Sequence, residues 1–132
     1  MEEVLKFLHE NSPFYFATVD KTTPKVRPLG LCLEHNGKIY FGIGTFKQAF
    51  KQLLANPQVE ICTTNKNSEW IRLHGTAIVD DNDAVLEKAF AAIPFLKNMY
   101  NEETGRKLGL FYLKDAVAEI ADMKGGFKEI KL

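Results

Sequence analysis

The stretch Tyr40-Phe41-Gly42-Ile43-Gly44-Thr45-Phe46-Lys47-Gln48-Ala49-Phe50-Lys51-Gln52-Leu53 joins a predicted β-strand, through two glycines, to a predicted helix. It contains no acidic residue, although Lys47 and Lys51 lie one helical turn apart. Lysines are unfavourable near a helix N-terminus, because this end carries unpaired N–H groups and the positive pole of the helix dipole. The stretch therefore predicts a phosphate-binding site where a strand meets a helix.

The strand before this helix has one nearly bare face. Alternation puts Tyr40, Gly42 and Gly44 on one side, opposite three larger apolar side chains. A flat ligand or another backbone can approach such a surface closely, but the glycines could equally mark a bulge or a bend in a barrel. Thr45 and Gln48 predict a capping box for a helix over 46–55.

Outward from this stretch, the chain consists of short predicted strands with few helices. Strands are predicted over 14–20, 26–34, 38–43, 59–64, 69–79, 108–113 and 116–123, with an edge strand over 127–130; helices are predicted over 3–10, 46–55 and 80–92, with a helical turn over 99–103. Asn36-Gly37 predicts a hairpin between 26–34 and 38–43. Because strands and helices do not alternate regularly, we expect one mainly β domain over residues 1–132, an antiparallel barrel with peripheral helices.

Composition excludes several classes of protein. The 17 basic and 17 acidic residues give zero formal net charge, which is unlike a nucleic-acid-binding protein. Residues 21–51 nevertheless hold six basic residues and one acid, an excess that suits a small anionic ligand. Charges interrupt every apolar run well before 18 residues, so no membrane span is predicted. The acidic N-terminus lacks the features of a secretory signal, which predicts a cytoplasmic protein.

Cysteines and histidines show no metal-ligand spacing. Cys32 and Cys62 each lie in an apolar strand, and we expect both to be buried structural thiols. His9, His35 and His74 are far apart, so no metal site is predicted.

A second cation lies beside a proline. Pro28 cannot donate to a β-ladder, so it predicts an edge strand or a bulge, where free backbone groups can meet a ligand. Arg27 next to it could bind a phosphate through two hydrogen bonds, or could simply face solvent.

Trp70, Arg72 and His74 share one face of the strand over 69–79. Such a stripe is typical of a ligand site or a subunit interface, and a solvent-facing strand side is the alternative.

Taken in order, these motifs resemble a known family. They are Pro24-x-x-Arg27-Pro28-Leu29, Ile39-Tyr40-Phe41-Gly42-x-Gly44-Thr45, Lys51, Leu53, Asn56-Pro57 and Trp70-Ile71-Arg72-Leu73-His74-Gly75-Thr76-Ala77. This order resembles the flavin-binding half of the pyridoxamine 5′-phosphate oxidase-like split-barrel proteins. The resemblance implies a six-stranded antiparallel split β-barrel that forms a homodimer, with FMN between the subunits. The short length, without the basic C-terminal extension of the oxidases proper, is similar to the nitroimidazole-resistance (Nim) branch.

The resemblance also implies roles for individual residues. Lys51 and Arg27 would hold the FMN phosphate, assisted by Thr45 and Lys47. The backbone around Pro28 and Leu29, and around Gly42, Ile43 and Gly44, would face the isoalloxazine ring, while Trp70, Arg72 and His74 would reach the flavin of either subunit.

The sequence therefore predicts an FMN-binding flavoprotein that transfers hydride or electrons to a small molecule, with no residue assigned as catalytic. One alternative is a non-catalytic module of the same fold that holds FMN, haem or another planar anion. Another is a structural barrel whose lysines are solvated.

Overall fold

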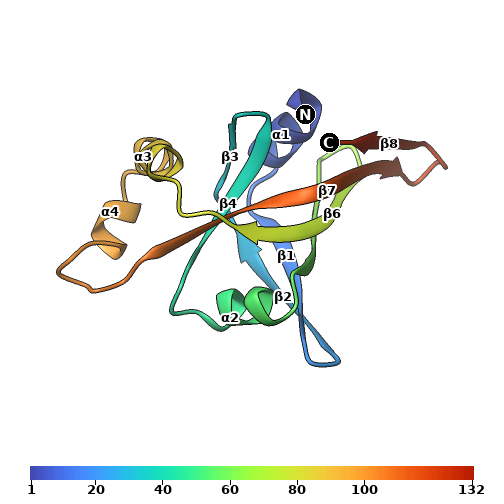
Figure 1. Ribbon diagram of the computed structural model, residues 1–132. Helices are drawn as coiled ribbons and strands as arrows, with labels where there is room; N and C mark the ends of the chain where they lie inside the picture. Colours follow the sequence, from blue (N-terminus) through green and yellow to red (C-terminus); the bar gives the residue numbers. More distant parts are fainter.

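The computed structural model describes residues 1–132 and shows eight antiparallel strands in one sheet with four helices (Figure 1). In chain order the elements are α1 (Glu2–Glu10), β1 (Phe14–Asp20), β2 (Thr23–Leu29), β3 (Cys32–His35), β4 (Lys38–Gly44), α2 (Gln48–Ala55), β5 (Gln58–Thr64), β6 (Glu69–Val79), α3 (Asp83–Ala92), α4 (Leu96–Met99), β7 (Leu108–Asp122) and β8 (Phe127–Lys131). The mainly β class predicted from the sequence is confirmed.

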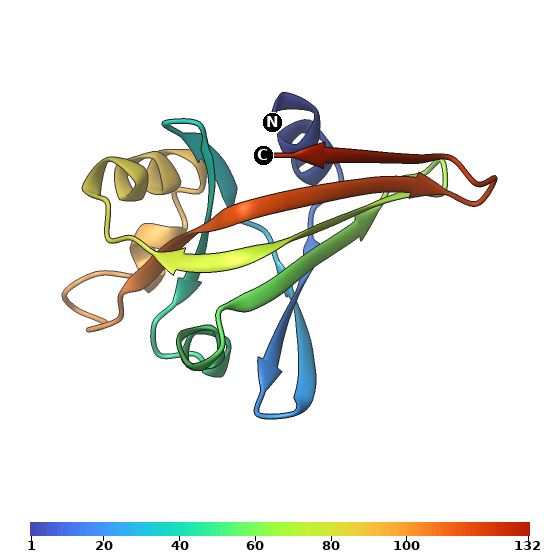
Figure 2. The ribbon, with the colours of Figure 1, turned by 45° about the vertical axis from the view of Figure 1, so that its right-hand side comes forward.

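The sheet is open and strongly curved, as in a split barrel. Its strand order is β2-β1-β5-β6-β7-β4-β3, and β8 pairs with the far half of β7. The long strands β6 and β7 cross the whole molecule side by side, and β8 continues beside β7 towards the C-terminus (Figure 2). The sheet has eight strands, whereas the family resemblance implied six.

The predicted strand over 26–34 is in fact two strands. β2 ends at Leu29 and pairs with β1, whereas β3 begins at Cys32 and pairs with β4. Pro28 lies on β2, which has only one neighbouring strand, so the predicted edge position is confirmed. The predicted hairpin holds only for β3 and β4, because the chain leaves one edge of the sheet at Gly30 and joins the other.

The strands predicted over 108–113 and 116–123 form one strand, β7, with a kink. Asp115 adopts a left-handed backbone with φ 53°, and the β6–β7 register shifts between His74 and Thr76. A β-bulge of this kind bends a strand without ending it. β8 confirms the predicted edge strand, and the helical turn expected over 99–103 lies earlier, at Leu96–Met99.

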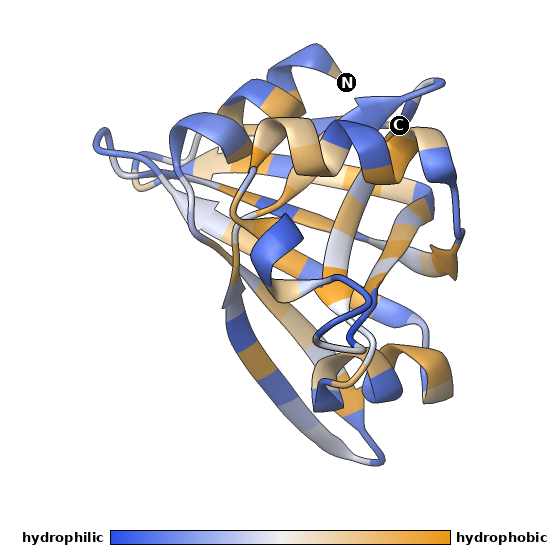
Figure 3. Ribbon diagram, turned by 90° about the vertical axis from the view of Figure 1, so that its left-hand side faces the viewer, coloured by the Kyte–Doolittle hydropathy of each residue, from blue (hydrophilic) through white to orange (hydrophobic).

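Apolar side chains form two clusters on opposite sides of β4. The larger fills the barrel and includes Phe16, Phe41 and Phe111, while the smaller lies under α3 and α4 and includes Tyr40 and Leu110. Figure 3 shows the corresponding bands of apolar and polar residues along the strands, with polar residues at the loop ends. Because β4 is buried on both faces, its glycine face meets other parts of the chain rather than solvent.

The cysteines differ from each other. Cys32 is buried, and burial raises the pKa of its thiol to about 12. Cys62 is exposed, so the expectation of a second buried thiol was wrong. It lies on the outward face of β5, between the buried Ile61 and Thr63.

No group of three or more potential metal ligands is present. None of the helices has the length and apolarity needed to cross a membrane.

Candidate functional site

A cleft of about 260 Å³ lies between the end of β2, the glycine part of β4, the start of α2 and the α3–α4 region. Its lining residues are Arg27, Pro28, Leu29, Gly30, Leu31, Gly42, Ile43, Gly44, Lys47, Ala49, Ile93, Leu96, Met99, Tyr100 and Leu108. The cleft thus brings together seven predicted site residues: the run Arg27-Pro28-Leu29, the run Gly42-Ile43-Gly44, and Lys47. Thr45 and Lys51 lie beside it without lining it.

The start of α2 is cationic and has no counter-charge. Lys47 is the N-cap residue, and Lys51 follows one turn later. Both side chains are exposed, and neither forms an ion pair. The first turn contains no acidic residue, and no side chain caps it. The arrangement suits an anion, because lysines at this end of a helix otherwise oppose the dipole.

The predicted capping box does not form. The helix begins at Gln48 rather than Phe46, and the N–H of Thr45 donates instead to the carbonyl of Lys107 at 2.9 Å. A tight turn, in which the N–H of Lys47 donates to the carbonyl of Gly44 at 3.0 Å, delays the helix start. The ring of Phe46 in this turn lies under the guanidinium of Arg106, 4.2 Å from ring centroid to charge centre.

Arg27 ties three elements together at the cleft. Its guanidinium donates to the hydroxyl of Thr18 on β1 and to the amide oxygen of Gln52 on α2, both at 2.7 Å. Thr18 also donates to Gln52 at 2.7 Å. Burial lowers the pKa of Arg27, yet all these partners are neutral, so a positive charge is held in place without a carboxylate. Arg27 is therefore held by other side chains of the protein and is not simply solvated, while its role towards a phosphate stays a prediction.

The glycine face of β4 is covered by side chains of the same protein. A Cβ atom on Gly42 would approach Leu31 to 2.7 Å, and one on Gly44 would approach the hydroxyl of Tyr100 to 2.8 Å. The two glycines therefore permit close packing of Leu31 and Tyr100. The nearly bare face that the sequence predicted is not observed. Burial raises the pKa of the Tyr100 phenol, and the nearby charge of Arg106 and the backbone of Gly44 oppose this effect in part.

Trp70, Arg72 and His74 are not brought to this cleft within one chain. They lie on the outer face of β6, opposite the buried Ile71 and Leu73. Arg72 donates to the carboxylate of Glu60 at 2.8 Å, and both Glu60 and Glu119 help to raise its pKa. Their role towards a cofactor stays a prediction.

One wall of the cleft was missed from the sequence. Ile93, Leu96, Met99 and Tyr100 line it from the α3–α4 region. Their spacing of three and four residues is that of one helical face, a signal that the stretch after Pro94 does carry.

Known proteins share this architecture. The sequence profile of the family described as pyridoxamine 5′-phosphate oxidase matches residues 1–121. A solved NimC/NimA family protein from Clostridium acetobutylicum is 39% identical with a TM-score of 0.90, over 100% of this chain and 92% of that chain. A pyridoxamine 5′-phosphate oxidase-related, FMN binding protein from Nostoc punctiforme is 16% identical with a TM-score of 0.58, over 99% and 95%. A heme binding protein from Mycobacterium smegmatis is 13% identical with a TM-score of 0.70, over 94% and 55%. No curated protein sequence matches this chain.

An open antiparallel sheet of this order, with a helix beginning at its glycine-bearing strand, defines a split-barrel-like β protein. The chain belongs to the pyridoxamine 5′-phosphate oxidase-like FMN-binding family, in which it is similar to the NimC/NimA protein.

Proposed function

We propose that this chain is an FMN-binding flavoprotein that acts as an oxidoreductase on a small molecule and works as a homodimer in the cytoplasm. The observation that carries the proposal is the placement of three cations without a carboxylate partner beside an apolar cleft. Lys47 and Arg27 line the cleft, and Lys51 lies one turn further along α2. FMN combines a phosphate with a flat, largely apolar ring, so its two ends match this pair of surfaces.

The donor set fits the phosphate end of FMN. Lys47, Lys51 and Arg27 would hold the phosphate, with Thr45 beside them. Because side chains cover Gly42 and Gly44, the ring would lie along the end of β2, where a Cβ atom on Gly30 would meet only Ser12, at 3.7 Å. Bound FMN supplies hydride and electron transfer. The chain itself contributes charge for the phosphate and apolar walls that exclude water from the ring.

The absorption spectrum of the purified protein tests the proposal directly. We expect a flavin spectrum, or uptake of added FMN by the colourless protein, followed by flavin reduction with a reduced nicotinamide or turnover of a nitroaromatic compound. A protein that neither carries nor takes up FMN would contradict flavin binding. A protein that binds FMN but turns over no substrate would leave a carrier rather than an enzyme.

A binding module for haem or another planar anion is the second candidate, favoured by the structural likeness to a protein described as heme binding. Within the cleft, only Met99 and Tyr100 are of the types that ligate haem iron. A Soret band after addition of haem, together with no uptake of FMN, would favour this candidate.

An unpartnered apolar face supports the homodimer. The outer face of the β1–β2 hairpin consists of Tyr15, Ala17, Val19, Pro24, Val26 and Pro28. Val26 is 67% exposed and Tyr15 49% exposed, although both are large and apolar. A contiguous apolar surface of this kind is typical of a subunit interface.

The proposed cytoplasmic location agrees with the cysteines. The two free thiols, Cys32 and Cys62, are in keeping with a reducing compartment.

A charge introduced on this face by substitution should prevent dimer formation without affecting folding. We expect Val26→Glu to shift the protein from dimer to monomer in sedimentation equilibrium while its circular dichroism stays unchanged, because Val26 supports no core packing in one chain. Lys66→Glu, on an exposed loop, is the matched control. A dimer that survives Val26→Glu would place the subunit contact elsewhere.

A further inference from the structure

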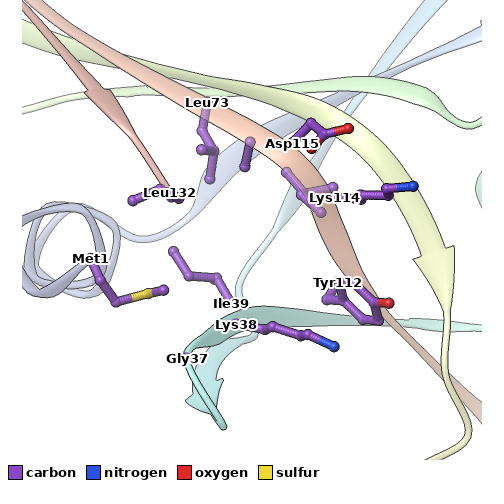
Figure 4. A pocket seen from close by; sticks show the side chains of 11 residues that line it. Met1, Gly37, Lys38, Ile39, Leu73, Tyr112, Lys114, Asp115 and Leu132 are labelled. Carbon is purple, nitrogen blue, oxygen red and sulfur yellow. The ribbon is translucent and has the colours of Figure 1, made fainter.

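A second hollow, of about 290 Å³, lies at another end of the barrel (Figure 4). It opens between the start of α1, the β3–β4 turn and the kink of β7, and it has no lining residue in common with the cleft beside α2. Its volume lies just below the range of roughly 300–1,000 Å³ that is usual for ligand pockets. Any occupant would therefore be small.

The hollow has an apolar side and a cationic side. Met1, Ile39, Leu73 and Leu132 occupy one side in Figure 4, and the amino groups of Lys38 and Lys114 lie on the other with the hydroxyl of Tyr112. Ile39 and Leu73 belong to the main core, so the apolar side is continuous with the interior of the barrel. A ligand in this hollow would meet apolar surface at one end and positive charge at the other.

The cationic side carries no counter-charge from the chain. Neither Lys38 nor Lys114 forms an ion pair. The ammonium of Lys38 lies 4.2 Å from the ring centroid of Tyr112, and this cation–π contact holds the charge in one position. Asp115 is also at the rim, yet its carboxylate pairs with neither lysine and lies across the hollow from Lys38.

The hollow exists because β7 bends here. Asp115 has φ 53°, and the register with β6 shifts beside Gly75. A non-glycine residue in this conformation costs on the order of 1 kcal/mol, and such strain persists only where the surrounding structure requires it. The kink places Tyr112 and Lys114 on one side of the opening and Ala116 on its apolar wall. Bulges are frequent next to binding sites because they redirect side chains in this way.

We propose that this hollow binds a small amphipathic anion, an apolar chain or ring that carries one carboxylate. The carboxylate lies between Lys38 and Lys114 and accepts a hydrogen bond from the hydroxyl of Tyr112, while the apolar body packs on Ile39, Leu73 and Ala116. The charge complementarity selects an anion over a neutral or cationic molecule of the same shape. The site is independent of the flavin cleft.

Titration calorimetry with octanoate tests this assignment on the purified full chain with its cofactor content measured. We expect octanoate to bind at one site per chain and to shift the methyl NMR signals of Ile39 and Ala116, while octylamine does not bind. Lys38→Met keeps the apolar stem and removes the charge. It should weaken octanoate binding about tenfold, the effect of losing one charge-assisted hydrogen bond.

Two controls keep the result specific. Lys97→Met removes a charge from the exposed face of α4 and should leave octanoate binding unchanged. Lys38→Met should leave the FMN content unchanged, so a failure here is separable from a failure of the flavin proposal. No octanoate binding, equal affinity for octanoate and octanol, or methyl shifts confined to the cleft beside α2 would each overturn the assignment.

Discussion

The helices α2 and α3 begin in opposite ways. At α3, the side chain of Asn82 accepts hydrogen bonds from the N–H groups of Ala84 at 3.0 Å and Val85 at 3.2 Å, and Asp83 adds a negative charge in the first turn. At α2, Lys47 occupies the N-cap position, no side chain caps the first turn, and no acid is present there. The chain therefore completes the start of α3 by itself and leaves the start of α2 positive for an external anion.

Charge reversal at α2 should have the largest effect. We expect the double variant Lys47→Glu/Lys51→Glu to lower FMN affinity at least about 100-fold, because two charge-assisted contacts to phosphate become repulsive. Fluorescence titration of the apoprotein with FMN measures this change. Lys66→Glu, which reverses the charge of one lysine on an exposed loop, should leave the affinity unchanged. Unchanged binding in the double variant would remove the start of α2 from the site.

Removing the cap of α3 should have a smaller effect, on stability alone. We expect Asn82→Ala to lower the free energy of unfolding by about 1 kcal/mol, because two N–H groups lose their acceptor. Urea denaturation measures the loss. Asn98→Ala, on α4, removes an exposed side chain that makes no hydrogen bond and should be close to neutral. A loss of the same size in both variants would show that the cap contributes nothing.

Giving α2 a cap should reduce the contrast between the two helices. We expect Lys47→Asn to raise the stability of the FMN-free protein by about 0.5 kcal/mol and to weaken FMN binding, because a cap replaces a cation. Lys47→Met loses the charge without gaining a cap, so it should weaken FMN binding without stabilising the apoprotein. Thermal unfolding with and without FMN separates the two variants. Equal stability of both would mean that the asparagine does not cap.

A further prediction concerns the contact that anchors the segment before α3. The hydroxyl of Tyr40 donates to the carboxylate of Asp80 at 2.7 Å; burial first, then this bond, raises the pKa of Tyr40 to about 12. The unfolded chain loses this proton near pH 10 and the folded protein only near pH 12, so stability falls as the pH rises between these values. Burial also raises the pKa of Cys32, from 9 to about 12, so this thiol likewise makes stability fall as the pH rises above 9.

Denaturation at pH 8 and pH 11 measures this dependence. We expect Tyr40→Phe to lose part of the alkaline fall, whereas Tyr15→Phe, at an exposed ring, keeps all of it. An identical pH dependence in the wild-type protein and Tyr40→Phe would show that Tyr40 does not titrate differently in the two states.

Local sequence signals predicted the strands well. The bounds of β1 and β6 match the predicted ranges, since alternating residues and flanking turns are encoded within each segment. The separation of β2 from β3 could not be predicted in this way, because it depends on which distant strand each one joins. The start of α2 was misplaced for the same reason: Thr45, a good local cap, bonds to Lys107, which lies far away in sequence.

The candidate site shows the same division. Lys47 and the glycines of β4 belong to one continuous stretch, so the junction of strand and helix was predicted from that stretch alone. The wall from Ile93 to Tyr100 comes from about fifty residues later in the chain, and only the folded sheet brings it to the cleft. The engagement of Arg27 with Thr18 and Gln52 likewise depends on three separate elements.

The burial of β4 on both faces has a consequence for the evolution of this chain. Phe41 fills the barrel while Gly42 admits Leu31 on the other side, so neighbouring residues have incompatible sizes. Inserting or deleting one residue within β4 would exchange the two sets, since side chains alternate with a period of two. We therefore expect relatives to conserve the length of β4 and the alternation of large and small side chains along it.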